Sequence, residues 1–373
     1  MPRNIIGGTL NLFDWVKAAI SIQSNSQSAK CVIYLGMYLL ENTPRGLYCE
    51  AGDFYIDPWR AVDFAIVTHA HSDHARAGSK NYLCAMPGGE ILRERLGAGA
   101  KIETLDYGNS LTRNGVKISL HPAGHILGSA QVRIESRGEV WVVSGDFKTE
   151  VEKTCAPFEP VRCHTFVTEC TFGLPIYRWP RQAETFSAIH SWWQENQAAG
   201  RTSVLFAYSL GKSQRLLSGL DSSWGPIFAH GAVAKFLPLY ANAGISLPSV
   251  LRAEPETITT AGGSGLVIAP GSTDGSTWLR KFGAASKAFA SGWMQIRGAR
   301  RRRALDRGFI LSDHADWNGL LESIQATGAE RIWATHGYTA QLVRWLRENG
   351  RDAHALKTQF EGELIEEDRT DAE

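Results

Sequence analysis

Four side chains that can bind a metal lie within one short segment of this chain, residues 69–74. The segment reads His-Ala-His-Ser-Asp-His and contributes His69, His71, Asp73 and His74. It follows an apolar run, 64–68, which predicts a β-strand that ends in an open turn. Core packing does not call for so much titratable material at a strand end, because burying polar groups is costly. Imidazole with carboxylate suits zinc, manganese or iron, so the segment predicts a metal site and hydrolytic chemistry.

A site for two metals needs more ligands than these four. Three later segments repeat the same pattern, an apolar strand followed by a short polar turn: His125 follows 118–120, Asp146 follows 140–143 and His336 follows 331–334. Each has a glycine beside it, which lets the backbone turn sharply or approach another segment closely. One such residue alone would have an ordinary structural explanation, but together the three repeat the geometry of the first cluster.

The elements that must position these residues change character along the chain. Up to about residue 170, short strands dominate, separated by turns such as Asn114-Gly115 and Arg137-Gly138, with a helix near 89–96. After Pro180, helices and short apolar strands alternate, which indicates βαβ units and a parallel sheet over 181–295. The predicted strands are 53–56, 64–68, 117–121, 131–135, 140–144, 165–168, 204–208, 226–229, 266–269, 309–311 and 331–335, and the later helices are 183–199, 212–220, 317–327 and 340–348.

Composition limits the class of protein. The chain has 373 residues and a formal net charge of +1, so no global attraction to nucleic acid or membrane can be argued. Six cysteines form no C-x-x-C pair, which predicts reduced thiols. The longest apolar run near the start, 31–40, is about half the length that a membrane span needs and does not resemble a signal peptide, so we expect a cytoplasmic protein without a membrane partner.

The motif His-x-His-x-Asp-His at 69–74, with the downstream Gly-His at 124–125 and Ser-Gly-Asp at 144–146, resembles the metallo-β-lactamase fold. Three more motifs are similar to those of its β-CASP nuclease branch, in which a cap domain is inserted into the lactamase-like fold. They are Thr-Glu-Cys-Thr-Phe-Gly at 168–173, Ser-Asp-His-Ala-Asp at 312–316 and Thr-His-Gly at 335–337. Position 170 is Cys where the acidic motif of the branch more often has Ser.

A narrower likeness is to the bacterial ligase-associated DNA exonucleases, and it runs from about residue 44 to about 356. It is carried by Gly-Leu-Tyr-Cys at 46–49, Gly-Asp-Phe-Tyr-Ile-Asp-Pro-Trp at 52–59, Phe-Gly-Leu-Pro-Ile-Tyr-Arg-Trp-Pro at 172–180 and Phe-Ala-Ser-Gly-Trp-Met at 289–294. The resemblance implies an α/β fold, namely an αββα sandwich with a smaller α/β cap. The expected parts are an N-terminal extension at 1–43, the sandwich at 44–180 and 296–360, the cap at 181–295 and an acidic tail at 361–373.

The resemblance also implies a role for each site residue. His69, His71 and His125 would hold one divalent metal, Asp73, His74 and His336 the other, and Asp146 would bridge the two. Zinc is the first expectation for both ions and manganese the alternative. Asp57 would orient the loop of the main cluster by hydrogen bonding. The catalytic residues would be Asp73, Glu169 and His314, with His314 as general acid, because a carboxylate neighbour raises the pKa of a histidine and favours the protonated donor.

Substrate contacts are a separate set of expectations. Lys212 and Ser213 begin a predicted helix whose N-terminus either binds a phosphate or is simply capped. Arg300, Arg301 and Arg302 belong to the densest basic run, which is either a solvated face or a grip on a DNA backbone. Tyr177, Trp179 and Trp293 either stack bases or pack in the core, and core packing is favoured for at least two of them.

Four functions remain open on the sequence. The first is a DNA exonuclease that trims single- or double-stranded ends for repair by a two-metal-activated hydroxide, beside an ATP-dependent DNA ligase and an Lhr-type helicase. The second is an RNA-processing nuclease of the same fold. The third is a small-molecule metallo-hydrolase, which the predicted inserted domain and the His314 motif disfavour. The fourth is a metal-stabilised DNA-binding module, which a complete ligand set with a candidate acid disfavours.

Overall fold

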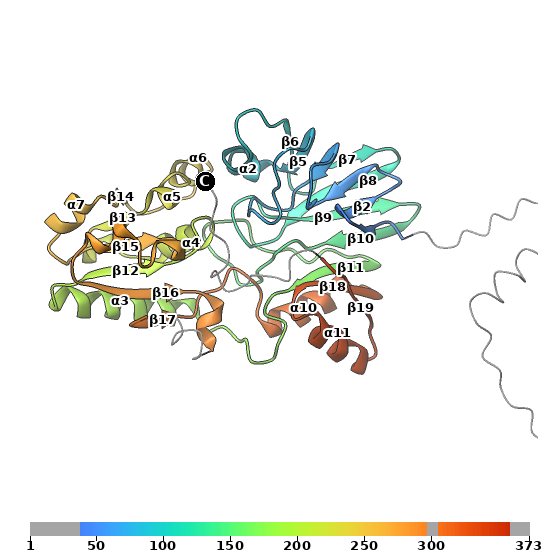
Figure 1. Cartoon of the computed structure of the whole chain (residues 1–373). Helices are drawn as coiled ribbons and strands as arrows, with labels where there is room; N and C mark the ends of the chain where they lie inside the picture. Colours follow the sequence, from blue (N-terminus) through green and yellow to red (C-terminus); the bar gives the residue numbers. More distant parts are fainter. Residues whose placement is uncertain (1–37, 297–304, 359–373) are drawn as a thin grey trace, which may run out of the picture. The chain divides into compact units, whose positions relative to one another are not determined.

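The computed structural model describes residues 38–296 and 305–358, and three β-sheets organise them (Figure 1). The first sheet has six strands in the order β1 to β6. Strand β2 is antiparallel to both β1 and β3, and β3 to β6 run parallel. The bounds are β1 Glu41–Thr43, β2 Gly46–Cys49, β3 Phe54–Ile56, β4 Phe64–Ile66, β5 Asn81–Ala85 and β6 Ile102–Leu105.

The second sheet has seven strands in the order β19-β18-β11-β10-β9-β8-β7. The strands β7 to β10 are antiparallel, and β10, β11, β18 and β19 are parallel. Both predicted turns lie in this sheet: Asn114 and Gly115 have φ of 47° and 82°, as type I′ hairpin turns require. The bounds are β7 Ser110–Arg113, β8 Val116–Pro122, β9 Ala130–Ser136, β10 Glu139–Val143, β11 Thr165–Cys170, β18 Arg331–Gly337 and β19 Asp352–Ala355.

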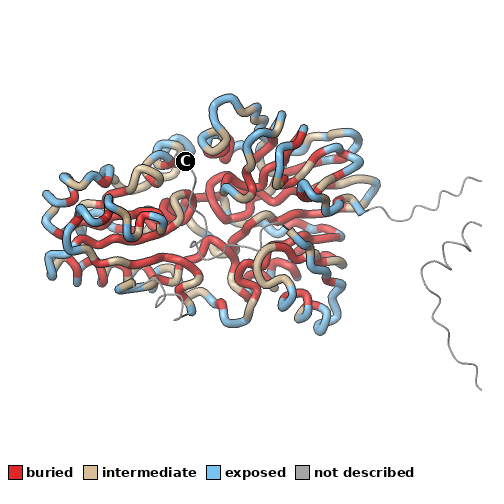
Figure 2. Tube along the Cα trace, viewed as in Figure 1, coloured by how far each residue is buried: buried red, intermediate tan, exposed pale blue. Residues whose placement is uncertain are grey.

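The first two sheets share one core. Ile66 and Leu83 of the first sheet and Ile118 and Val143 of the second belong to one cluster of buried apolar side chains. Helix α2 (Gly89–Leu96) packs on other side chains of the first sheet, and helices α10 (Trp317–Thr327) and α11 (Thr339–Glu348) pack on the second. Figure 2 shows the strands of both sheets as mostly buried, with exposed residues concentrated in the outer turns and helices.

The third sheet has the order β14-β13-β15-β12-β16-β17, and every pair in it is parallel, which confirms the predicted βαβ pattern. Two separate apolar clusters flank it, one with helices α3 and α4 and the other with α7 and α8. The strands are β12 Thr202–Phe206, β13 Ile227–Ala229, β14 Leu251–Arg252, β15 Leu266–Ala269, β16 Ala285–Ala290 and β17 Arg307–Phe309. The helices are α3 Gln182–Ala198, α4 Lys212–Gly219, α5 Gly231–Ala234, α6 Leu237–Asn242, α7 Pro255–Thr260 and α8 Thr277–Arg280.

The segment around the third sheet also contacts the first sheet. Leu210, Phe236 and Tyr240 belong to the same buried cluster as Val67 and Ile126. The loops that follow β4 and β8 therefore pack directly against α6 and the start of α4. This apolar contact brings the third sheet beside the segments that carry the predicted ligands.

Two observed strands bear on the expected domain boundaries at residues 43 and 295. Strand β1 lies inside the expected extension 1–43, and Leu40 is fully buried in the core of the first two sheets. The third sheet continues beyond residue 295 to β17. Residues 1–37 and 359–373 lie outside the described ranges. Within those ranges no helix is long and apolar enough to cross a bilayer, and the cysteines described are free thiols, at positions 49, 84, 155, 163 and 170.

Candidate metal centre

Strand directions bring the predicted ligands to one edge of the second sheet. Because β8 and β10 are each antiparallel to β9, they run the same way, and β11 and β18 are parallel to β10. Their carboxyl ends therefore lie at one edge. His125 follows β8, Asp146 follows β10, and Glu169 and His336 lie near the ends of β11 and β18. The segment 68–74 reaches this edge from β4 of the facing sheet: Ala130 N donates to Thr68 O at 2.8 Å.

Two glycines beside these ligands are required by the close approach of the chain. Gly145 has φ of 55°, and a Cβ there would lie 2.7 Å from the side chain of Thr68. Gly337 has φ of 80°, and its Cβ would lie 2.3 Å from the carbonyl oxygen of Cys170. His336 itself has φ of 55°, an uncommon conformation for a residue with a side chain. Such strain persists only where the surrounding structure imposes it, and it is concentrated at functional sites.

The first ligand set consists of His69, His71 and His125. His71 Nδ1 lies 3.1 Å from His69 Nε2 and 3.1 Å from His125 Nε2. Asp146 Oδ2 completes the group at 3.5 Å from His69 Nε2 and 3.8 Å from His125 Nε2. Nitrogens bound to one tetrahedral ion at zinc–nitrogen distances of 2.0–2.1 Å are about 3.3 Å apart. The observed nitrogen separations therefore fit a common ion.

The other ring nitrogen of each of these histidines is held by the protein. His69 Nδ1 lies 3.1 Å from Thr68 Oγ1, His71 Nε2 donates to Leu210 O at 3.1 Å, and His125 Nδ1 donates to Asp313 O at 2.9 Å. A hydrogen bond at one nitrogen fixes the tautomer and aims the other nitrogen at the ion. The Leu210 and Asp313 carbonyls come from outside the predicted ligand segments.

Burial sets the protonation of the first set. It is the largest influence on the imidazoles of His69, His71 and His125, and it lowers the pKa of each below its ordinary value. All three are therefore neutral near pH 7 and present lone pairs, the state in which imidazole binds a metal. Burial opposes ionisation of Asp146, but His74 and then His69 outweigh it and hold the pKa of that carboxyl well below its usual range.

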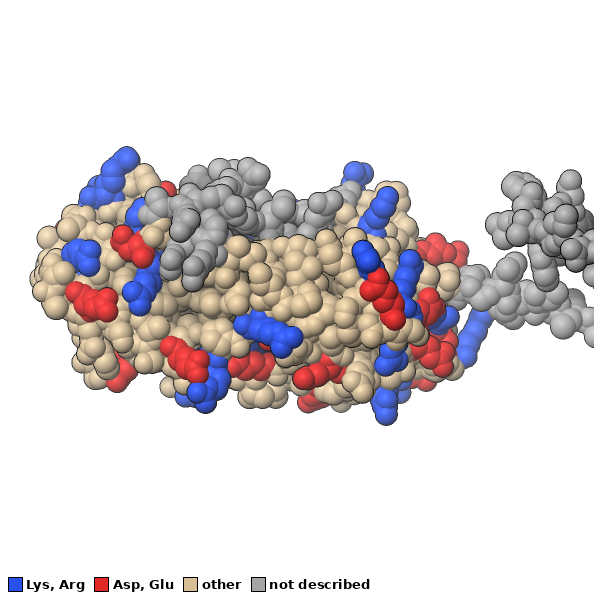
Figure 3. Space-filling model, turned by 90° about the horizontal axis from the view of Figure 1, so that it is seen from below, with Lys and Arg blue, Asp and Glu red and all other residues tan. Residues whose placement is uncertain are grey.

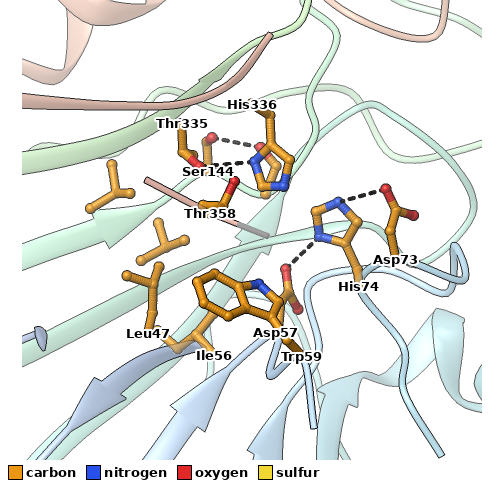
Figure 4. Close-up of a pocket in the computed structure, with 13 residues that line it drawn as sticks. Leu47, Ile56, Asp57, Trp59, Asp73, His74, Ser144, Thr335, His336 and Thr358 are labelled. Carbon is orange, nitrogen blue, oxygen red and sulfur yellow. Dashed lines mark hydrogen bonds and ion pairs between the residues drawn. The ribbon is translucent and has the colours of Figure 1, made fainter. Parts of the chain in front are cut away.

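The second set, Asp73, His74 and His336, converges less tightly. His74 Nε2 lies 3.9 Å from Asp73 Oδ2, and the rings of His74 and His336 stack with centroids 5.3 Å apart (Figure 4). His74 Nε2 also lies 3.5 Å from Asp146 Oδ1. Among the described residues, these three do not form a group whose ligand atoms all lie within 4.8 Å, unlike the first set with Asp146. Asp146 faces both sets, with Oδ2 toward the first and Oδ1 toward His74.

A buried atom without a hydrogen-bond partner marks the second set. His74 Nε2 makes no hydrogen bond of good geometry, since its nearest acceptor is Asp146 Oδ1 at 3.5 Å, although the ring is buried and its Nδ1 is 2.7 Å from Asp57 Oδ2. Burial lowers the pKa of His74, but the carboxylates of Asp146, Asp57 and Asp73 together raise it well above its ordinary value. So much negative charge around a buried ring with an unsatisfied nitrogen is what a dication would neutralise. The donors present therefore fit a metal here as well.

Asp57, which directly follows β3, contacts the segment 68–74 that carries the candidate ligands. Its carboxylate accepts from Thr68 N at 2.8 Å and Thr68 Oγ1 at 2.6 Å, and it contacts His74 Nδ1. Asp57 adopts φ of 45°, so its own backbone is in the left-handed region. The same carboxylate thus orients His74 directly and His69 through Thr68.

The acidic motif and the Ser-Asp-His motif meet beside the ligands. His314 Nδ1 lies 2.8 and 3.0 Å from the two carboxylate oxygens of Glu169. Glu169 also accepts from Phe147 N at 2.8 Å and from Thr171 N at 3.2 Å, so its position is fixed by the backbone. Ligand atoms of Asp146, Glu169 and His314 all lie within 4.8 Å of one another. A carboxylate that holds Nδ1 of a histidine directs its Nε2 elsewhere, as an acid–base pair requires.

Lys212 and Ser213 begin α4, but their side chains are fully buried. Lys212 Nζ lies 3.4 Å from Asp313 Oδ2, and Ser213 Oγ donates to Tyr208 O at 2.6 Å. The backbone N–H at the N-cap of α4 donates to Gln214 Oε1 at 2.7 Å. The start of the helix is therefore capped by its own residues. These contacts favour the capped helix start over the phosphate site, because both side chains are buried and bonded within the protein.

The structure treats the other residues expected to contact substrate in different ways. Arg300, Arg301 and Arg302 lie outside the described residues. Tyr177 is fully buried, with its ring packed against Phe172 at 4.9 Å between centroids. On the face seen in Figure 3, basic and acidic side chains are interspersed, in keeping with a net charge near zero.

Three residues that hold the centre together had no role in the expectations from sequence: Leu210, Asp313 and Arg215. The first two act on histidines through backbone carbonyls, which leave no signal in a side-chain pattern. Arg215 is fully buried and contacts His125 O, Ser312 O and the Asp313 carboxylate. No sequence signal identified Arg215, because an arginine inside a predicted amphipathic helix is ordinarily assigned to the solvent face.

Comparison with known proteins gives several relatives and no match to a protein-family model. The chain is 33% identical over 315 residues to a protein named probable DNA ligase from Opitutus terrae, which covers 83% of this chain. It is 29% identical over 170 residues, 44% of the chain, to Endoribonuclease YSH1 of Saccharomyces cerevisiae. It is 29% identical over 147 residues, 36% of the chain, to cleavage and polyadenylation specificity factor subunit 3 of Dictyostelium discoideum.

The chain spans only part of each of these relatives: 30% of the probable DNA ligase, 21% of YSH1 and 18% of the polyadenylation factor subunit. Among solved structures, a protein of unknown function from Enterococcus faecalis V583 is similar with a TM-score of 0.54 over 80% of both chains. The identity there is 13%, so the likeness is one of fold.

Proposed function

We propose that this chain, a member of the β-CASP branch of the metallo-β-lactamase family, is a metal-dependent exonuclease that trims DNA ends. The observation that carries the proposal is the arrangement of two histidine sets on either side of Asp146, with the Glu169–His314 pair 4.8 Å or less from that carboxylate. Such an arrangement would supply both a place for two cations and a proton donor beside them. Phosphodiester hydrolysis needs both.

The proposed assignment of ligands keeps the two sets described above. His69, His71 and His125 would hold one ion, Asp73, His74 and His336 the other, and Asp146 would face both. Zinc is proposed first and manganese second, since imidazole and carboxylate suit both. When bound, the ions would supply Lewis-acid chemistry, which activates water and neutralises charge on the scissile phosphate.

The protein's own groups would carry the proton. Glu169 holds His314 by Nδ1, so Nε2 is the atom we assign to give a proton to the leaving 3′-oxygen. Two backbone N–H groups fix Glu169 and keep the pair in register with Asp146. Thr68 and Asp57 keep the rings of His69 and His74 aimed at the centre, so the acceptor geometry exists before substrate arrives.

The finer architecture is part of this proposal. The first two sheets with α2, α10 and α11 would be the αββα sandwich, and the third sheet would be the β-CASP cap. We place the cap from residue 181 to about 309, because β17 belongs to the third sheet.

Purified chain should be incubated with end-labelled DNA and RNA, each single- and double-stranded, with zinc, manganese or magnesium. We expect stepwise shortening of DNA. The matched variants are His314→Ala, expected to be inactive with metal retained, and His354→Ala, expected to be active because His354 is exposed and pairs only locally with Asp352. Cleavage of none of the four substrates would contradict a nuclease, and a wide preference for RNA would contradict the DNA assignment.

RNA processing is the second candidate, and one finding favours it. Two of the relatives are named as an endoribonuclease and a polyadenylation factor subunit, although they cover less than half of this chain. The relative that covers 83% of the chain is named as a probable DNA ligase, which is why DNA is placed first.

We further propose that the chain works with an ATP-dependent DNA ligase, and with an Lhr-type helicase that exposes ends. Support for the ligase comes from the relative in which a similar segment makes up 30% of a chain named probable DNA ligase. Ligation needs clean ends, so trimming is a sensible preceding step. A nick with a short mismatched flap should be sealed by such a ligase only when the wild-type chain is added, and not with His314→Ala. Sealing without the chain would contradict the partnership.

A further inference from the structure

Arg215 occupies an unusual position for an arginine. It lies on α4, in the segment around the third sheet, and is 1% exposed. Its Nε donates to Glu152 Oε2, its Nη1 donates to Ser312 O at 2.6 Å, and its Nη2 donates to His125 O at 3.2 Å. Nη1 also lies 2.7 Å from Asp313 Oδ1. One planar guanidinium therefore contacts three segments that are separate in the sequence, at residues 125, 152 and 312–313.

Two of those segments contain residues of the candidate centre. The first contains His125, a member of the tightly converging ligand set, whose carbonyl Arg215 grips. The second contains Ser312, Asp313 and His314. Asp313 in turn uses its own carbonyl to accept from His125 Nδ1 at 2.9 Å. Arg215 thus reaches the His125 ring by two routes, through the backbone of His125 itself and through Asp313.

The buried carboxylates near Arg215 need its positive charge. The side chains of Glu152 and Asp313 are 4% and 2% exposed, so their charges must be paired inside the protein. Burial would raise the pKa of Asp313, but Lys212 and Arg215 outweigh it and hold that pKa well below its usual range. Lys212 also lies on α4, so both cations that neutralise Asp313 come from one helix.

We propose that Arg215 is a positioning residue that couples the docking of α4 to the hold on the first metal and to the placement of His314. A guanidinium satisfies several acceptors at once through its rigid fork, whereas an ammonium on the same site supplies charge without the fork. The activity readout of this proposal rests on the proposed function, but its metal readout does not.

The test compares Arg215→Lys with Arg331→Lys. Arg331 is the control, because it also pairs with a glutamate, Glu139, and donates from Nε to a side chain, Thr165 Oγ1 at 2.9 Å, although its own side chain is 33% exposed. It lies at the start of β18, five residues before His336, which is about 16 Å along a strand. Zinc affinity is measured by competition with a chelating dye, the cobalt(II) absorption spectrum reports ligand geometry, and kcat and KM are measured on single-stranded DNA.

We expect Arg215→Lys to fold, as checked by circular dichroism, because the buried charge is kept. Its zinc affinity should fall about 10–100-fold and its cobalt spectrum should shift, as for lost support of a ligand histidine. kcat should fall with KM nearly unchanged. Arg331→Lys should stay within about two-fold on every measure. A folded Arg215→Lys with the zinc affinity, spectrum and kcat of Arg331→Lys overturns the proposal.

If Arg215→Lys does not fold, the charge-balanced pair Glu152→Gln with Arg215→Gln takes its place, and the same loss of zinc affinity is expected. Unchanged zinc affinity in that double variant overturns the proposal equally. The two proposals can fail separately. A wild-type chain that binds zinc but cleaves no nucleic acid contradicts the proposed function, while the zinc comparison still decides the role of Arg215.

Discussion

The two ligand sets of the centre are organised in different ways. His69, His71 and His125 converge with nitrogens 3.1 Å apart, and each ring is fixed from behind by a hydroxyl or a backbone carbonyl. The set of Asp73, His74 and His336 is looser, with His74 Nε2 unsatisfied between two carboxylates at 3.5 and 3.9 Å. The first set is preorganised by geometry, the second by accumulated charge.

If the proposed two ions bind, they should therefore respond to different disturbances. Two of the three supports of the first set, the carbonyls of Leu210 and Asp313, lie far from its histidines along the chain, so that set depends on how the third sheet docks. The third support, the hydroxyl of Thr68, is local. The supports of the second set are Asp57 and the hydroxyl of Thr335, which lies 3.0 Å from His336 Nδ1. That set depends on local charge.

The largest effect should come from the carboxylate that both sets share. We expect Asp146→Asn to lower activity about 10³-fold or more, because it removes charge next to two ions, each of which contributes several kcal/mol. Metal content by atomic absorption should fall toward zero or one ion per chain. Two firmly held ions in this variant would show that Asp146 is not common to the sets.

Loss of the proton donor should separate catalysis from metal binding. His314→Ala should lower kcat about 10²–10⁴-fold, the usual contribution of a general acid, with metal content unchanged. Glu169→Gln should lower kcat in the same direction, because Glu169 orients His314 through its Nδ1. A substrate with a good leaving group, such as a p-nitrophenyl phosphodiester, should recover most of the loss. If both substrates lose activity equally, His314 is not the acid.

Removing the carboxylate that holds His74 should affect metal binding by the two sets differently. Asp57→Asn weakens the hydrogen bond to His74 and the local negative charge, so affinity for one of the two ions should fall about 10–100-fold. The other ion should be retained nearly as in the wild type, because the first set reaches Asp57 only through Thr68. Zinc titration resolves the two affinities. A parallel fall in both would mean that the sets are organised together.

The smallest effect concerns acid stability. The folded pKa of the Asp313 carboxyl is depressed, since Lys212 and Arg215 outweigh burial, so the folded state binds this proton less readily than the unfolded state. Its stabilisation is therefore complete above the ordinary carboxyl pKa of about 3.9 and is lost as the pH falls through the folded value, at up to about 1.4 kcal/mol per pH unit. Urea unfolding of metal-free wild type and Asp313→Asn should give curves that approach each other below about pH 4. Parallel curves would exclude this linkage.

Much of the fold follows from local pattern. Residues 317–327 form α10 with the predicted bounds, and the Asn-Gly turn at 114–115 is the hairpin turn expected. Alternating helices and apolar runs after residue 180 correctly indicated a parallel sheet. Strands such as β16, Ala-Ser-Lys-Ala-Phe-Ala, escaped prediction. Alanine and lysine have weak strand propensity, and only the neighbouring strands β12 and β17 make this segment extended.

The candidate site, like the fold, could be predicted from the sequence only in part. The segment 69–74 could be identified from the sequence, because its residue types have few explanations other than a metal site. The motif at 312–316 likewise identified His314 as a candidate site residue. No pattern could indicate that Arg215 contacts residues 63, 90 and 97 positions away. Nor could it show that Lys212 faces Asp313 rather than solvent.

The chemistry available to this chain was thus set by the sequence alone, because imidazole and carboxylate side chains carry their ligand preferences wherever they stand. Which nitrogen faces which oxygen was decided by the tertiary structure. The reason is physical: strand directions bring the ends of β8, β10, β11 and β18 to one edge, and backbone carbonyls from distant segments then fix the rings. The candidate metal-binding segment at 69–74 can therefore be found from the sequence alone, but the relative positions of its side chains depend on the tertiary structure.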